Sequence, residues 1–166
     1  MHFVESKSVK ISVLPEQVKQ LSSKESIEEA FLTENVLSFD IYKDESLIGF
    51  IMVRQFDEGK YFLWNYAIDY KYQNQKYGTK ALVDFIAYME KEYRMSVLTT
   101  TYKAGNEFAK KLYEKIGFIE TDVVEEEDCH EVNMIYFCRT YLNSEEESYG
   151  KNCCYRRRRF TIQCSD

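Results

Sequence analysis

A short polar stretch with a single glycine, residues 73–79, has the composition of a phosphate-binding loop. It directly follows the strand-like run 61–69 and precedes an amphipathic stretch. A strand, a polar turn and a helix present several backbone N–H groups to an anion, and the helix N-terminus adds a partial positive charge. Each residue of the loop is therefore a candidate binding residue: Gln73, Asn74, Gln75, Lys76, Tyr77, Gly78 and Thr79.

A second segment, residues 106–118, follows at the distance that one strand–helix–strand unit requires. It contains Tyr113, whose phenol carries a transferable proton. Taken alone, Tyr113 is better explained as a helix-face residue that packs beside Leu112 and Ile116. Asn106 has the side chain of a helix N-cap. The residues of this segment therefore admit both a structural and a chemical interpretation.

Together the two segments resemble the acyl-CoA-binding and thiol-facing motifs of the GCN5-related N-acetyltransferases. The resemblance covers roughly residues 14–137. Within the family it is closest to bacterial spermine/spermidine N-acetyltransferases, on residues 15–17 and 26–30. It implies acetyl-CoA as cosubstrate, with the pyrophosphate on the 73–79 backbone and the pantetheine along Ala67 and Ile68. It also implies that Tyr113 is the general acid for the departing thiolate and that Asn106 caps its helix or binds the cofactor.

Two positions depart from the family pattern. Lys76 stands where the family's loop has a central glycine, so its side chain either meets a phosphate or obstructs the loop. Asn65 stands on the strand where many relatives have a carboxylate. The general base is therefore left open between Asp69, Asp40 and a water molecule held by backbone groups.

The expected reaction is acetyl transfer to a primary amine, with a polyamine such as spermine or spermidine as the leading acceptor. Residues 1–138 carry 24 acidic and 16 basic side chains, a net charge of −8, which favours a cationic ligand. Candidate acceptor-binding carboxylates are Glu28, Glu29 and Glu34. Three alternatives stay open: another amine (a peptide N-terminus or an aminoglycoside), a non-catalytic acyl-CoA sensor, and an interaction module that uses the C-terminal segment.

The periodicity of apolar residues indicates the helices and strands that must position these site residues. Their order predicts an α/β fold with a mixed sheet and helices on both faces. Its two central strands, 60–69 and 96–102, should be parallel, and the resemblance implies that they splay apart as in the acyl-CoA N-acyltransferase fold. With only about a dozen residues before Pro15, the family's first strand is expected to be short, missing or replaced by helix. The other expected strands are 36–42, 47–53, 118–125 and 131–137, and the expected helices are 14–21, 26–32, 79–93 and 106–116.

Composition sets the remaining expectations. Residues 1–138 are expected to form one domain, and residues 139–166, with four consecutive arginines, a poorly structured basic tail. No apolar run reaches eighteen residues and no secretory leader is evident, so we expect a cytoplasmic protein without a membrane partner. The five cysteines lack zinc-site spacing, which predicts reduced thiols and no metal. The acidic body argues against nucleic-acid binding, and a homodimer remains an option.

Overall fold

The structure, a computed structural model, describes residues 1–18, 21–126 and 129–138. The expected basic tail, 139–166, lies outside the described residues. The described elements run along the chain in the following order: β1 (His2–Glu5), α1 (Pro15–Val18), α2 (Lys24–Ala30), β2 (Val36–Lys43), β3 (Ser46–Asp57), β4 (Lys60–Ile68), the 3-10 turn η1 (Tyr70–Tyr72), α3 (Tyr77–Glu92), β5 (Val97–Lys103), α4 (Glu107–Ile116), β6 (Ile119–Glu126) and β7 (Cys129–Phe137).

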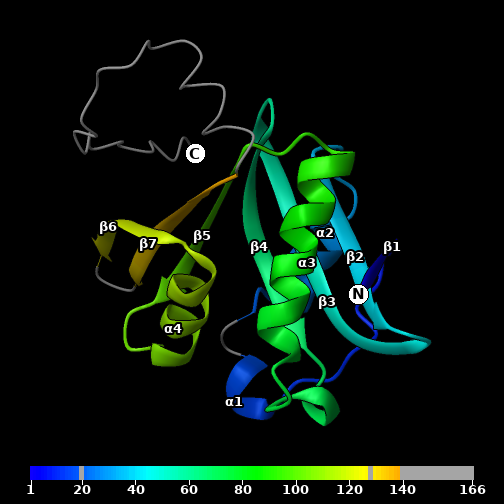
Figure 1. The fold of residues 1–166 in the computed structure, drawn as a ribbon. Helices are drawn as coiled ribbons and strands as arrows, with labels where there is room; N and C mark the ends of the chain where they lie inside the picture. The colour runs from blue at the N-terminus through cyan, green and yellow to red at the C-terminus, as the bar shows by residue number, and fades with distance from the viewer. Residues whose placement is uncertain (19–20, 127–128, 139–166) are drawn as a thin grey trace.

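The strands form one seven-stranded sheet in the order β1-β2-β3-β4-β5-β7-β6. The β4–β5 pair is parallel and the other neighbouring pairs are antiparallel, which confirms the predicted mixed α/β fold. Both parallel crossovers, β4–α3–β5 and β5–α4–β6, step in the same direction along the sheet, so right-handed connections place α3 and α4 on one face. Figure 1 shows both helices in front of the sheet and α2 behind it.

The first strand is short, one of the three possibilities that the sequence left open, with His2–Glu5 paired to residues 39–42 of β2. Two other boundaries differ from the sequence-based expectations. Strand β3 continues to Asp57 and not to residue 53, because its last residues still pair with the start of β4 across a tight turn at Gly59, whose φ is 65°. Helix α1 begins at Pro15, one residue after the expected start, and is described to Val18; residues 19–20 of the expected helix lie outside the described residues. Ser23 caps α2 by accepting a hydrogen bond from Ser26 N at 3.1 Å.

Two apolar clusters cover the two faces of the sheet. The larger lies under α3 and α4 and includes the fully buried side chains of Phe39, Leu82, Phe85 and Leu98. The smaller lies under α2, where Ile27 and Ala30 pack with Val36, Phe50 and Met52. The sheet is thus held from both sides, and its central strands form a rigid support for side chains at their carboxyl ends.

The parallel pairing of β4 and β5 is short. It runs over four residue pairs, from Lys60 opposite Val97 to Leu63 opposite Thr100, although β4 continues to Ile68 and β5 to Lys103. The two strands therefore diverge beyond Leu63 and Thr100, which confirms the predicted splay. We call the point of divergence the fork.

A β-bulge at Trp64 lies directly beside the fork. Leu63 pairs with Val53 and Asn65 with Met52, so Trp64 is the extra residue in β4. One extra residue reverses the alternation of side chains. Before the bulge Leu63 belongs to the α3-side cluster, and after it Tyr66 packs against that same cluster, whereas Trp64 packs against the α2-side cluster. The bulge thus turns Tyr66 toward α3.

Candidate active site

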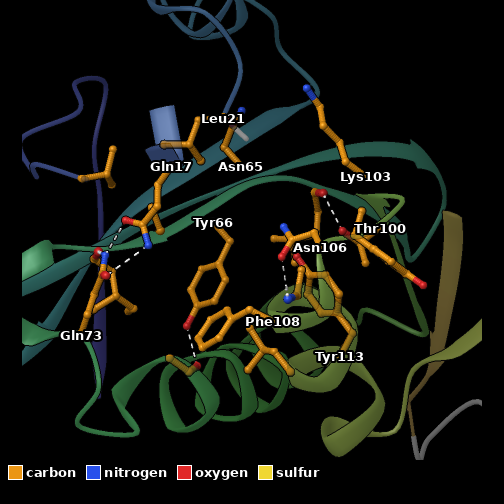
Figure 2. A pocket seen from close by; sticks show the side chains of 18 of the residues that line it. Gln17, Leu21, Asn65, Tyr66, Gln73, Thr100, Lys103, Asn106, Phe108 and Tyr113 are labelled. Atoms are coloured by element: carbon orange, nitrogen blue, oxygen red, sulfur yellow. Dashed lines mark hydrogen bonds between the residues drawn. The ribbon is translucent and has the colours of Figure 1, made fainter. Parts of the chain in front are cut away.

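A cleft of about 870 Å³ opens where β4 and β5 diverge. Its walls come from β4, the start of α3, the end of β5, the first half of α4 and the segment around α1 (Figure 2). It brings together most of the predicted site residues: Ala67, Ile68, Gln73, Asn74, Lys76, Tyr77, Gly78, Thr79, Asn106 and Tyr113. Gln75 belongs to the same loop without lining the cleft, and its side chain donates to Lys71 O at 3.2 Å.

The loop that leads into α3 adopts the conformation that glycines would favour, without the glycines. Asn74 has a φ of 60° and Lys76 a φ of 62°, both in the left-handed region. Lys76 is the N-cap residue of α3, its side chain makes no capping hydrogen bond, and the first turn carries no acidic residue. The first N–H groups of a helix have no acceptor within the helix. Here they lie at the cleft beside exposed Lys76, an arrangement that fits an anion such as a pyrophosphate.

Tyr66 ties the strand β4 to the first turn of α3. Its hydroxyl donates to Gly78 O at 2.5 Å (Figure 2). Burial, with a smaller contribution from nearby Tyr113, holds the pKa of Tyr66 well above its ordinary value, so the phenol stays a neutral donor. A Cβ at Gly78 would lie 3.8 Å from both this hydroxyl and Ile68 Cγ1, an ordinary contact. Tyr66 was not among the site residues predicted from the sequence, because only the bulge reveals which way its side chain faces.

Tyr113 lies at the fork. Its side chain is 8 % exposed and its ring packs on Phe118 with centroids 5.3 Å apart. Thr100, the last residue of the parallel pairing, lies beside it and donates from Oγ1 to Leu63 O at 3.2 Å. Burial raises the pKa of the Tyr113 phenol, and the Thr100 side chain offsets part of that increase. The phenol is therefore protonated at neutral pH, at the point where the parallel strands part.

Asn106 and Asn65 both act as structural amides. Asn106 caps α4, with Oδ1 accepting from Ala109 N at 3.1 Å, and it also lines the cleft. Asn65 is 3 % exposed; its Oδ1 accepts from Ser22 N at 2.9 Å and its Nδ2 donates to Ser22 Oγ at 3.2 Å. Asn65 thereby fixes the segment before α2 against β4. A neutral amide engaged in this way does not serve as the general base.

The carboxylates considered for the base lie elsewhere. Asp40 is 1 % exposed and pairs with Lys10 Nζ at 2.5 Å, away from the cleft lining. Asp69 accepts from Ser12 N at 2.9 Å and from Lys71 N at 3.0 Å, and it does not line the cleft. Among the described residues that line the cleft, Glu131 is the only one with a carboxylate side chain.

The three glutamates expected to bind the acceptor do not line the cleft. Glu28 and Glu29 lie on exposed positions of α2, and Glu34 is exposed in the turn that follows it. The ammonium of Lys24 is 3.7 Å from Glu28 Oε1. Helix α2 uses its other face for the core, so these carboxylates point outward.

The wall opposite α3 and α4 has a different lining. Trp64 lines it, with the Arg54 guanidinium 5.4 Å from the centre of its ring. Lys103 and Glu131 are directly opposite each other on β5 and β7, so they share a face of the sheet. In Figure 2 Lys103 lies on the side of Gln17 and Leu21, away from Tyr113. The cleft therefore has two sides that meet at the fork.

Other site types find no support in the described part of the chain. Residues 1–18, 21–126 and 129–138 contain no group of three or more His, Cys, Asp or Glu side chains that could hold a metal ion. Within the same ranges no helix is long and apolar enough to span a bilayer. Cys138 is a free, buried thiol.

The splayed parallel strands, with the uncapped N-terminus of α3 at their carboxyl ends, form a cleft that fits an acyl-CoA ligand. A family comparison agrees: residues 9–118 match the model of the acetyltransferase (GNAT) family. The chain belongs to this family. It is an N-acetyltransferase, and acetyl-CoA is its cosubstrate.

Solved structures share the fold. A GNAT family acetyltransferase from Elizabethkingia anophelis with acetyl-CoA bound is 18 % identical, with a TM-score of 0.63 over 82 % of this chain and 97 % of that one. The spermidine N-acetyltransferase from Vibrio cholerae, in complex with CoA and spermine, is 17 % identical, with a TM-score of 0.61 over 72 % and 76 %. The ribosomal-protein-S18-alanine N-acetyltransferase from Escherichia coli is 25 % identical, with a TM-score of 0.55 over 69 % and 74 %. A search of curated proteins found no significant match.

Proposed function

We propose that the protein transfers the acetyl group of acetyl-CoA directly to a primary amine in a ternary complex at the fork, and that the acceptor is a polyamine. The observation that carries the proposal is the position of Tyr113, a buried protonated phenol where the parallel strands part. A departing thiolate, whose conjugate acid has a pKa of about 8.5, would be protonated by such a group.

The cofactor would enter between the N-termini of α3 and α4. Its pyrophosphate would lie on the backbone of residues 73–79, where the α3 N-terminus has no capping side chain. Its pantetheine would follow Ala67 and Ile68, which lie on β4 beyond its pairing with β5. Asn106 and the exposed ring of Phe108, both on the cleft wall, would border it on the α4 side.

Each bond change in the reaction has a place in this arrangement. The neutral amine attacks the thioester carbonyl, and a tetrahedral oxyanion forms. A backbone N–H of the diverging part of β4 would stabilise that oxyanion. Collapse breaks the carbon–sulfur bond, and Tyr113 gives its proton to the leaving sulfur. The acceptor ammonium would lose one proton to a water molecule before the attack and its nitrogen a second proton after it, because Asn65 is engaged and Glu131 lies farther along the strand. Solvent would then return a proton to Tyr113.

On the acceptor side of the cleft, the position of Glu131 supports the proposal of a polyamine acceptor. It lies opposite Lys103, three residues beyond Thr100, a rise of about 10 Å along the strand. That separation is too long for a base acting at the fork, but it suits a second ammonium group of an extended polyamine. The −8 charge of residues 1–138 adds a long-range attraction.

A specificity experiment tests this role of Glu131. The variant Glu131→Gln keeps the shape and removes the charge, so we expect its KM for spermidine to rise about tenfold, as for the loss of one charge-assisted hydrogen bond. The KM for a monoamine should stay within twofold of the wild-type value. Equal effects on both acceptors would contradict the assignment of Glu131 to a second ammonium.

A peptide N-terminus is the second candidate acceptor. The observation in its favour is the 25 % identity to a relative whose name gives a ribosomal-protein alanine as its substrate. The scarcity of carboxylates on the cleft wall also suits a less cationic acceptor. Acetylation of an alanine-initiated peptide in preference to spermidine would replace the polyamine proposal. A cytoplasmic location, a homodimer, one domain over residues 1–138 and the absence of nucleic-acid binding remain predictions.

A further inference from the structure

The side-chain amides of Gln17 and Gln73 form a reciprocal pair across one end of the cleft. Gln17 Nε2 donates to Gln73 Oε1 at 3.1 Å, and Gln73 Nε2 donates to Gln17 Oε1 at 2.8 Å (Figure 2). Both amides have a further anchor: Gln73 Nε2 also donates to Ile68 O at 2.9 Å, and Gln17 Oε1 also accepts from Leu14 N at 3.2 Å. The pair thus joins α1 to the first residue of the phosphate loop.

Two more hydrogen bonds join the segment before α1 to the residues between β4 and the loop. Tyr70 N donates to Ser12 O at 2.9 Å, and Ser12 N donates to Asp69 Oδ2 at 2.9 Å. The segment 12–17 is therefore attached at both of its ends to residues 68–73, which connect β4 to the loop. These contacts join parts of the chain that are more than fifty residues apart.

The phosphate loop needs support of this kind. Asn74 and Lys76 lie in the left-handed region, where a residue with a side chain costs about 1–2 kcal/mol. Strained conformations of this sort persist when the surrounding structure holds them. Within the described residues, no side chain caps the N-terminus of α3. Tyr66 holds the end of the loop through Gly78 O, and the anchors before the two left-handed residues are Gln73 and η1.

We propose that Gln17 is a positioning residue for the cofactor loop. It holds Gln73 so that the following backbone presents its N–H groups to the pyrophosphate without reorganisation on binding. Gln17 also lines the cleft beside Leu21, so the same side chain fixes the acceptor-side wall relative to the cofactor. The inference rests on the proposed cofactor site and assigns to α1 a role in cofactor affinity.

The test replaces Gln17 by methionine, which keeps the length of the side chain and removes its amide. Calorimetric titration with CoA should show about tenfold weaker binding, the loss expected for two hydrogen bonds of ordinary net strength. The KM for acetyl-CoA should rise by a similar factor, and kcat at saturating acetyl-CoA should stay within twofold. Gln55→Met is the matched control. The Gln55 amide also makes a hydrogen bond, to Asp57 O, but it lies at the carboxyl end of β3 and does not line the cleft.

A double-mutant cycle separates positioning from general stability. Gln73→Met should weaken CoA binding, and adding Gln17→Met to it should have little further effect, because the two amides act as one unit. A Gln17→Met protein that binds CoA as tightly as the wild type would overturn the inference while leaving the proposed function intact, even if its melting temperature were lower. A wild-type protein that does not bind CoA would overturn both.

Discussion

At the scale of single residues, the proposed chemistry depends on Tyr113 being held at the fork as a proton donor. Its ring is fixed by Phe118 and its hydroxyl lies beside Thr100. Tyr113→Phe removes the transferable proton and keeps the packing. We expect kcat to fall roughly 10²-fold or more, with the Kd for CoA little changed, because general acid catalysis is lost and the binding surface is kept. Rapid-mixing measurement of thiol release gives kcat, and a wild-type value would mean that Tyr113 is only a packing residue.

The same environment fixes the pH dependence. Burial raises the pKa of Tyr113 above the ordinary value of about 10, so the protonated, active form persists below and somewhat above that pH. We therefore expect the alkaline side of the kcat profile to stay level up to about pH 10. A decline in kcat with a midpoint near pH 8 or 9 in the wild type, without loss of structure by circular dichroism, would contradict this assignment.

At the scale of elements, the sequence was sufficient for what depends on periodicity and capping. The strand 60–69, the helix that follows it and the cap at Asn106 all follow from local patterns. The bulge at Trp64 could not be predicted in this way. An extra residue gives a strand no distinctive local pattern, and it becomes visible only in the pairing of β4 with β3. The Gln17–Gln73 pair was missed for a similar reason: two polar residues far apart in sequence give no local signal.

The loop of residues 73–79 holds Lys76 in the left-handed region, with a φ of 62°. Lys76→Gly removes the strain of a left-handed lysine, and the gain is partly offset by the greater freedom of glycine in the unfolded chain. We expect the free energy of unfolding to rise by up to about 1 kcal/mol in urea denaturation. Lys76→Ala removes the same charge but keeps the strain, so it should give no such increase. Equal stability changes in the two variants would show that the charge and not the backbone is responsible.

At the scale of the whole molecule, the net negative charge favours a polycationic acceptor, whereas the described cleft lining contains one carboxylate, Glu131. The charge of −8 over residues 1–138 attracts a polycation over several ångströms, and salt screens this attraction. The apparent KM for spermine should therefore rise steeply between 50 mM and 500 mM salt, whereas that for a neutral-tailed monoamine should change little. A salt-independent KM for spermine would mean that the overall charge does not contribute to acceptor capture.

The central claim is that the cleft at the fork transfers acetyl groups to an amine. Its most direct test is incubation of the protein with acetyl-CoA and a panel of spermine, spermidine, an aminoglycoside and an alanine-initiated peptide, with acetylated products identified by mass spectrometry. The account predicts acetylated spermidine or spermine, formed in equal amount to free CoA and suppressed by Tyr113→Phe. Binding of acetyl-CoA without any acetylated amine would contradict the account and identify the protein as a sensor.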